Sequence, residues 1–112
     1  MRRSTVILAA LRRGRDFADR EFAAPLTVES MAREANMSKF HFARSFAAVY
    51  GETPRAYLTR RRIERAKNLL RAANLTVTEV CLLVGFESLG SFSWLFSRQC
   101  GQSPSAFRNS QR

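Results

Sequence analysis

The sequence has little of what disulfide-rich, metal-binding and membrane proteins depend on. Its 112 residues include two cysteines, one histidine and three prolines, and no apolar run approaches the roughly 20 residues that a transmembrane helix needs. Cys81 and Cys100 have neither metal-ligand spacing nor further partners for a disulfide framework, and both fall in apolar helical patterns. We therefore expect buried thiols in a reducing compartment, with no metal and no cofactor.

Catalytic groups are equally scarce. The sequence has no paired carboxylates and no glycine-rich phosphate loop, and His41 is its only histidine. An enzyme is therefore the least favoured function class, and His41 is expected to be solvated or to contact a phosphate. The first 17 residues, MRRSTVILAALRRGRDF, start like a signal peptide but have no small-residue cleavage site. We expect a first amphipathic helix there, with an apolar face formed by Val6, Leu8, Ala9, Leu11, Phe17 and Ala18.

Acidic residues are few, and the net charge is correspondingly high. Nine Asp and Glu stand against 19 Lys and Arg, for a formal charge of +10. All but Lys39 and Lys67 of the basic residues are arginine, whose fork makes two parallel hydrogen bonds to a phosphate or a base edge. Genome base composition also produces an arginine bias, so the charge itself is the stronger signal. A small domain this basic usually has a polyanionic partner.

One pattern is present twice. Residues 42–51 read FARSFAAVYG and residues 92–101 read FSWLFSRQCG, so each copy has Phe, three residues, Phe, four residues and Gly. Further pairs at the same offset of 50 are Ser38/Ser88, Thr53/Ser103, Pro54/Pro104 and Tyr57/Phe107, and upstream Leu26-Thr27-Val28 returns as Leu75-Thr76-Val77. Two copies are too few for a solenoid. The pattern indicates a tandem duplication of one small unit.

Each unit predicts a helix, a tight turn and a second helix. Short apolar-periodic segments cover 27–35 and 76–84, and longer ones follow. The residues expected to start, turn and end these helices are Thr27, Asn36, Ser38 and Gly51 in the first copy and Thr76, Gly85, Ser88 and Gly101 in the second, with a capping box at Thr76–Glu79. Thr53-Pro54 and Ser103-Pro104 each open a further helix. This is the outline of a helix-turn-helix, present twice.

The second helix of each unit has a core face and an outward face. At about 100° per residue the core faces are Phe42, Phe46 and Val49 with Tyr50 at the edge, and Phe92, Phe96 and Cys100. The outward faces are Phe40, Arg44, Ala47 and Ala48, and Gly90, Trp94, Ser97 and Arg98. An outward Phe40 and an outward Trp94 either cover a neighbouring helix or enter the DNA major groove. Apolar groups there meet thymine methyls, and Arg44 can fork onto guanine.

A helix of about 20 residues is expected between the units. Its buried stripe is Ile63, Ala66, Leu70 and Ala73, and Glu64 can pair with Arg60 or Asn68. Such a helix is roughly 30 Å long, close to the 34 Å or so that separates successive major grooves on one side of B-DNA. A rigid helix of this length would hold two groove-reading helices about one helical turn apart, so that one chain does what usually takes a dimer. The basic run 60–62 is either a solvated helix face or lies along phosphates.

The motifs resemble the DNA-binding domain of the AraC/XylS family of bacterial transcription regulators over nearly the whole chain. The strongest match is Val77-x-x-Val80-Cys81-x-x-Val84-Gly85-Phe86-x-Ser88-x-x-x-Phe92-x-x-x-Phe96-x(4)-Gly101-x-Ser103-Pro104-x-x-Phe107-Arg108. The resemblance implies an all-α fold of about seven helices, in which two homeodomain-like helix-turn-helix subdomains are joined by one long bridging helix. We expect a first subdomain at 5–52 with its helix-turn-helix at 27–50, the bridging helix at 54–73, and a second subdomain at 75–109 with its helix-turn-helix at 76–100.

The resemblance also implies DNA-contacting residues. Base contacts are expected from Phe40, Ala43, Arg44, Leu89, Gly90, Ser91, Ser93 and Trp94, and phosphate contacts from Lys39, His41, Thr53, Arg60, Arg62, Arg98 and Ser103. Trp94 stands where the family commonly has Arg or Lys, Gly90 where a polar residue is common, and Cys81 where Ala is usual. The second unit therefore has fewer hydrogen-bonding side chains for base edges. Its reading depends more on shape, thymine methyls or phosphates.

The sequence thus predicts a sequence-specific regulator of transcription that binds double-stranded DNA as a monomer on an asymmetric site. It would act in the cytoplasm at the nucleoid, with RNA polymerase as a candidate second partner and no membrane. Two alternatives remain: a non-specific architectural nucleic-acid-binding protein, which the charge alone would serve, and a protein-interaction module that docks through Phe40 and Trp94. Many family members carry an effector domain before this one, so the chain resembles either the short stand-alone members or an excised domain.

Overall fold

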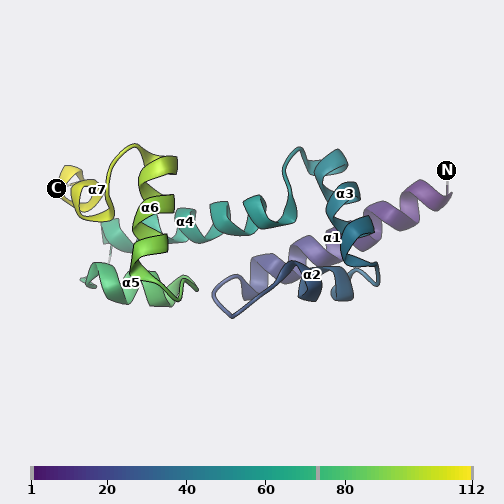
Figure 1. Cartoon of the computed structure of the whole chain (residues 1–112), viewed down its shortest axis with the longest axis horizontal. Helices are drawn as coiled ribbons and strands as arrows, with labels where there is room; N and C mark the ends of the chain where they lie inside the picture. Colours follow the sequence, from purple (N-terminus) through teal and green to yellow (C-terminus); the bar gives the residue numbers. More distant parts are fainter. Residues whose placement is uncertain (1, 73, 112) are drawn as a thin grey trace. The chain divides into compact units, whose positions relative to one another are not determined.

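The computed structural model describes residues 2–72 and 74–111, which form seven helices and no strand (Figure 1). In chain order the helices are α1 (Arg2–Glu21), α2 (Val28–Glu34), α3 (Lys39–Tyr50), α4 (Pro54–Ala72), α5 (Val77–Leu83), α6 (Leu89–Cys100) and α7 (Pro104–Ser110). The predicted all-helical fold class is confirmed. The chain divides into two compact units, Met1–Thr59 and Arg60–Arg112, and the division falls inside α4. Ala73, expected in the buried stripe of this helix, lies outside the described residues.

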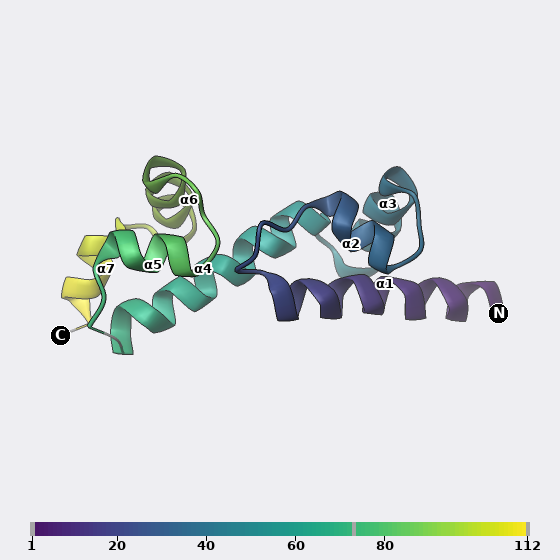
Figure 2. The same ribbon diagram turned by 90° about the horizontal axis from the view of Figure 1, so that it is seen from below.

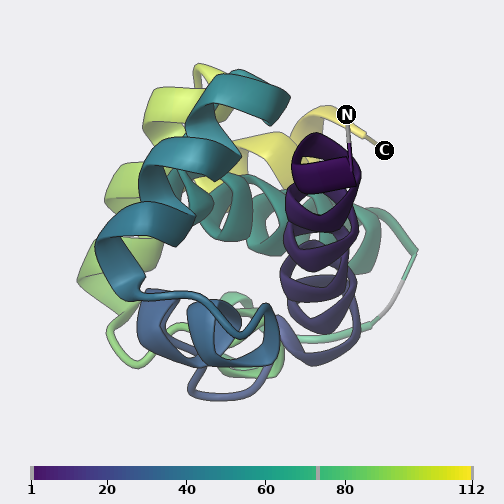
Figure 3. The same cartoon turned by 90° about the vertical axis from the view of Figure 1, so that its right-hand side faces the viewer.

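In the first unit, α1, α2 and α3 pack against one another (Figure 2). Viewed along α1, both α2 and α3 lie on the same side of it (Figure 3). Their core consists of Ala10, Leu11, Ala18, Met31, Ala32, Ala35, Phe42, Phe46 and Tyr57, the last from the start of α4. Phe42 and Phe46 are fully buried, and the Tyr57 hydroxyl donates a hydrogen bond to the Asp19 carboxylate of α1. Helix α3 therefore packs against α1, α2 and the start of α4.

The second unit builds a matching core from the rest of α4 and from α5, α6 and α7. Its members are Ile63, Ala66, Leu70, Val80, Cys81, Val84, Phe86, Phe92, Phe96 and Phe107. Successive rings lie in tilted or edge contact, with centroids 5.3 Å apart for Phe86–Phe92, 5.7 Å for Phe92–Phe96 and 5.5 Å for Phe96–Phe107. Contacts of this kind add directional preference to the burial of apolar surface.

The predicted helix boundaries are confirmed by the hydrogen bonds that form them. Thr27 and Thr76 both cap their helices in capping boxes, completed by Ser30 in α2 and by Glu79 in α5. The hydroxyls of Ser38 and Ser88 accept bonds from the amides of His41 and Ser91, each at 3.2 Å. Asn36 and Gly85 have positive φ, and α3 and α6 end on left-handed Gly51 and Gly101 with φ of 80° and 79°.

The duplication extends to burial. Over 38–57 and 88–107, every position has the same level of burial in both copies, whether buried, half-buried or exposed. The ring geometry repeats as well, because Phe42–Phe46 and Phe46–Tyr57 in the first unit have centroid distances of 5.5 and 5.6 Å. Two different sequences therefore fold into the same local shape, with the same side-chain positions turned outward.

Several expected core positions are wrong. On α1, Val6 and Leu8 are 65% and 44% exposed and Ala9 is exposed, because the buried stripe runs instead through Ile7, Ala10 and Leu11 to Gly14 and Ala18. On α3, Val49 is 44% exposed, because Tyr50 packs in its place with its ring 4.6 Å from that of Phe46. Cys81 is buried as expected, whereas Cys100 in the last turn of α6 is only half-buried. Burial raises the pKa of both thiols.

Gly14 and Gly90 are both helical glycines, and their surroundings predict opposite responses to alanine. A Cβ on Gly14 would lie 2.7 Å from the Phe42 ring and 3.1 Å from the Met31 carbonyl oxygen, whereas one on Gly90 would meet only the Ser88 hydroxyl, at 3.6 Å. Gly14→Ala should lower the free energy of unfolding by about 1–3 kcal/mol through overpacking. Gly90→Ala should leave it unchanged or raise it by up to about 1 kcal/mol. Urea unfolding followed by circular dichroism measures both, and equal effects would contradict the packing around Gly14.

Candidate nucleic-acid interface

The first recognition helix, α3, exposes one contiguous face because two phenylalanines fix the opposite face. Phe42 and Phe46 fill the core one turn apart, so Phe40 and Arg44, on the opposite side of the helix, point outward. Phe40 is 77% exposed, although burial is the rule for a side chain of its size. Four of the predicted contact residues share this exposed half of α3: Lys39, Phe40, His41 and Arg44. Ala43, also expected to touch bases, is half-buried.

Lys39 is already engaged by an acidic residue that the sequence did not single out. Its ammonium lies 2.6 Å from the Glu29 carboxylate of α2, and both side chains are about half exposed. Hydrogen bonding to Lys39 is the main reason that the pKa of Glu29 is lowered. An exposed pair of this kind contributes little to stability. It restrains Lys39 at the first turn of α3, where a phosphate would compete with the carboxylate.

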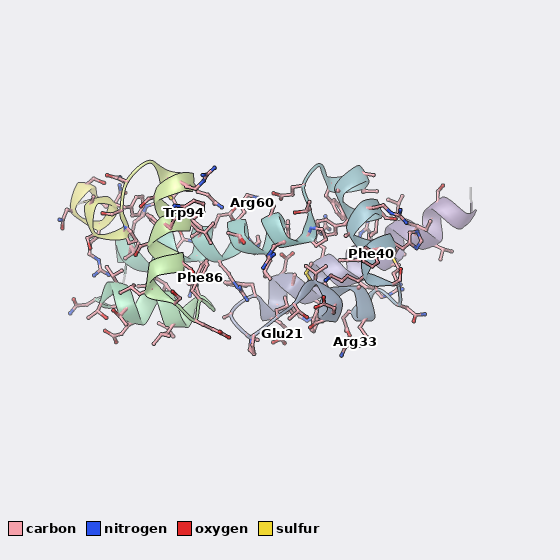
Figure 4. All side chains as sticks on the ribbon, in the orientation of Figure 1. Glu21, Arg33, Phe40, Arg60, Phe86 and Trp94 are labelled. Carbon is pink, nitrogen blue, oxygen red and sulfur yellow. The ribbon has the colours of Figure 1, made fainter. Side chains whose placement is uncertain are left out.

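The second recognition helix, α6, has an outward face of different chemistry. Leu89, Gly90 and Ser91 are exposed, Ser93 is half-buried, and Trp94 is 59% exposed. The Arg98 guanidinium, one turn further on, lies 4.8 Å from the centre of the Trp94 ring, within the range of a cation–π contact. Figure 4 marks Trp94 on α6 and Phe40 on α3. The expectation that both aromatic residues face outward is therefore confirmed.

A shallow depression of about 410 Å³ lies on this face and is lined by Gly90, Ser91, Trp94 and Leu95; we refer to it as the α6 hollow. Leu95 was not among the predicted contact residues. It is half-buried and packs against the core of its unit. Its position one residue after Trp94 and four after Ser91 was the available signal that it borders the outward face.

The predicted phosphate-contacting hydroxyls sit at helix starts. Thr53 Oγ1 accepts a bond from the Ala56 amide and Ser103 Oγ from the Ala106 amide, each at 3.1 Å. Each hydroxyl keeps its own proton for donation. Both residues are exposed, and each lies three residues after the end of α3 or α6. Both therefore lie at the surface near the C-terminal end of those helices.

Two arginines of the basic run 60–62 are paired with a carboxylate. Arg60 and Arg61 contact the two oxygens of Glu64 at 2.5 and 3.1 Å, which bears out the expected pair of Glu64 with Arg60. Arg62 is half-buried, with its guanidinium 5.9 Å from the Phe86 ring. Desolvation lowers the pKa of Arg62, and the charge of Glu87 opposes that shift. The turn between α5 and α6 has five residues, against four between α2 and α3, and Glu87 is the additional one. Its effect on Arg62 therefore has no counterpart in the first unit.

The part of the chain that the structure describes offers little for other chemistry. It contains no group of three or more His, Cys, Asp or Glu side chains that could hold a metal ion. None of the helices it forms is long and apolar enough to span a membrane. What it does present is an outward recognition-helix face in each unit, on a chain of high positive charge.

Two helix-turn-helix units, each with an exposed second helix, define a double helix-turn-helix protein. A family model described as a helix-turn-helix domain matches residues 31–110. The chain belongs to the AraC/XylS family of helix-turn-helix transcription regulators.

Individual relatives are similar over most of this chain. The transcriptional regulator AlkR of Acinetobacter baylyi is 40% identical over 84 residues, which is 75% of this chain and 28% of AlkR. The bifunctional transcriptional activator and DNA repair enzyme AdaA of Bacillus subtilis is 31% identical over 93 residues, 83% of this chain and 44% of AdaA. The chain thus spans less than half the length of either protein. The DNA-binding domain of the global transcriptional factor AdpA, solved with a target DNA, is 32% identical with a TM-score of 0.87, covering 91% of this chain and 92% of that one.

Trp94 is the only tryptophan, so its fluorescence reports the outward face of α6 directly. Because the side chain is 59% exposed, acrylamide should quench the native protein nearly as efficiently as the protein unfolded in urea. Stern–Volmer titration at equal temperature measures both states, with a free tryptophan amide as the reference. Strong protection in the native state would mean that another surface covers Trp94.

Proposed function

We propose that the chain is a sequence-specific regulator of transcription that binds double-stranded DNA as a monomer and places α3 and α6 in adjacent major grooves. It would act in the bacterial cytoplasm, at the nucleoid, without enzymatic activity. The observation that carries the proposal is the pair of outward faces. Their positions have the same exposure in both units but hold different side chains.

Unlike side chains on matching faces favour sequence reading over general charge attraction. A non-specific binder needs only positive charge. Its charge requirement would not explain why α3 exposes Phe40 and Arg44 while α6 exposes Gly90 and Trp94 at the matching positions. Arg44 has the fork that recognises the O6 and N7 atoms of guanine, and exposed aromatic groups contact thymine methyls. AlkR and AdpA, named as a transcriptional regulator and as a global transcriptional factor with a target DNA, support the same function.

The phosphate contacts in the proposal come from residues around each recognition helix. Thr53 and Ser103 would donate their hydroxyl protons, and Lys39, His41 and Arg98 would add charge or hydrogen bonds. Arg60 would contribute once phosphates compete with Glu64, and Arg62 would add its positive charge. Such contacts fix register and supply most of the salt-dependent affinity, but they carry no sequence information.

Binding as a monomer follows from the two units in one chain. In a dimeric helix-turn-helix protein each subunit supplies one recognition helix, and the two meet the DNA about one helical turn apart, 34 Å or so. Here α4 has 19 residues, about 28 Å at 1.5 Å per residue, and its two ends belong to the two units. The target would then be asymmetric, since α3 and α6 carry different side chains.

Selection from a randomised duplex pool at about 150 mM salt tests the function as a whole. The expected result is a motif of two unequal blocks about one helical turn apart. A single block would contradict base reading by both units. No enriched motif, with affinity that collapses as salt rises, would replace the proposal by the non-specific architectural function that the charge of +10 also favours.

Substitutions at Arg44 and Arg62 separate base reading from phosphate binding. Arg44→Ala should weaken binding to the selected site by about 1–3 kcal/mol and relax the preference at one base pair. Arg44→Lys is the matched control, because it keeps the charge but loses the fork. Arg62→Gln should weaken binding to every duplex similarly and lower the salt slope by about one unit. Equal losses for Arg44 and Arg62 variants on all sequences, measured by fluorescence anisotropy at several salt concentrations, would contradict these roles.

A further inference from the structure

The first two turns of α6 expose no charged side chain. Where α3 has Phe40 and Arg44, α6 has Gly90 and Trp94, and the other exposed residues there are Leu89 and Ser91. Both units nevertheless contain an aromatic residue followed four positions later by arginine. The pair is Phe40 and Arg44 in α3, and Trp94 and Arg98 in α6, where it begins one turn later. The N-terminal residues of a recognition helix are the ones that contact base edges, so in α6 the aromatic ring takes the place that arginine has in α3.

Hydrogen bonding offers α6 little discrimination between bases. Ser88 Oγ already accepts the Ser91 amide as the helix cap. The hydroxyls of Ser91 and Ser93 can donate or accept, so either fits several base edges, and neither makes the two-point contact that arginine, asparagine or glutamine makes. What remains on this face is apolar surface. In the major groove the apolar group that distinguishes one base pair from another is the C5-methyl of a pyrimidine.

The α6 hollow gives such a methyl a place to bind. Its lining combines the indole of Trp94, the side chain of Leu95, the Ser91 side chain and the bare backbone of Gly90. Around Gly90 the space is open, since a Cβ there would meet only the Ser88 hydroxyl, at 3.6 Å. The fold therefore does not require glycine at this exposed helical position, and alanine would favour the helix more. Glycine instead keeps the hollow open to a base edge.

Arg98 holds the indole in position. Its guanidinium lies 4.8 Å from the Trp94 ring centre, and an ordered side chain loses less conformational entropy on binding. Arg98 lies in the third turn of α6, beyond the residues that approach base edges most closely. Its charge would thus face the DNA backbone while the ring faces the bases.

We propose that the α6 hollow reads the C5-methyl group of a pyrimidine in the major groove, with Trp94 as the specificity-determining residue. Thymine and 5-methylcytosine both present this group. The proposal rests on the proposed function, because it concerns the block of the target that the second unit contacts. It assigns to α6 an apolar mode of reading that differs from the hydrogen-bonded mode of Arg44.

The test compares the selected duplex with duplexes in which a single C5-methyl group has been removed from or added to one base. Arg44→Ala first identifies the block that α3 reads, and the other block is assigned to α6. Replacing one thymine in the α6 block by uracil removes only the methyl, and affinity should fall about fourfold, the value of one buried carbon group. At the same position, 5-methylcytosine should bind about fourfold better than cytosine. An effect of uracil without an effect of 5-methylcytosine would support thymine as the only source of the methyl, and no effect of uracil at any thymine in the block would overturn the proposal.

Variants show whether Trp94 is the residue responsible. Trp94→Ala should reduce the thymine-to-uracil affinity ratio in the α6 block from about four to about one, and leave base preference in the α3 block unchanged. Arg44→Ala should instead leave the thymine-to-uracil ratio in the α6 block unchanged and weaken base preference in the α3 block. Since Trp94 is exposed, its removal should preserve the unfolding transition, and circular dichroism checks this. A ratio that persists in Trp94→Ala would overturn the assignment. Absence of any motif in the pool selection would instead contradict the proposed function.

Discussion

The structure depends on a ladder of aromatic rings that anchors each recognition helix. Phe42 and Phe46 contact each other and then Tyr57, as Phe92 and Phe96 contact each other and then Phe107. These four phenylalanines, two on α3 and two on α6, have no solvent exposure. Removing one such ring would cost about 3–5 kcal/mol. Because the two rings of each pair lie one helical turn apart, they fix both the position of the helix and its rotation about its own axis. The identity of the outward residues then follows from helical geometry alone.

This constraint explains how two copies with different surfaces keep one shape. Caps, ring contacts and burial agree at corresponding positions from Ser38 to Tyr57 and from Ser88 to Phe107. The exposed positions are free of those requirements and have diverged. The same backbone therefore carries two different exposed faces, one with Phe40 and Arg44 and one with Gly90 and Trp94. Differences at the exposed positions Phe40/Gly90 and Arg44/Trp94, which the fold leaves free, are what a function carried by those faces would produce.

Most of the fold could be predicted from the sequence because its signals are local. A threonine or serine before a helix, glycine or asparagine after it and phenylalanine at every fourth position each depend on neighbours within one turn. The errors at Val6, Leu8 and Val49 arose where burial depends on which helix lies opposite. Gly14 was missed in the stripe of α1 because it has no apolar side chain to count. At the candidate interface Phe40, Arg44, Gly90 and Trp94 were correctly predicted to face outward, whereas Ala47 and Ser97 are half-buried. The contacts of Lys39 with Glu29 and of Arg62 with Phe86 join separate segments and have no local signal.

The two cores share one helix. The start of α4 contributes Tyr57 to the first core, as α7 contributes Phe107 to the second. The rest of α4 contributes Ile63, Ala66 and Leu70 to the second core. These three residues have the same spacing as Leu11, Gly14 and Ala18 of α1. Each copy is therefore a four-helix module, α1–α4 or α4–α7, and seven helices result where two separate modules would need eight. A break between Tyr57 and Ile63 leaves each core its own residues of α4 but shortens this helix in both modules. Only overlapping fragments that both contain residues 54–72 would keep the whole helix in each half.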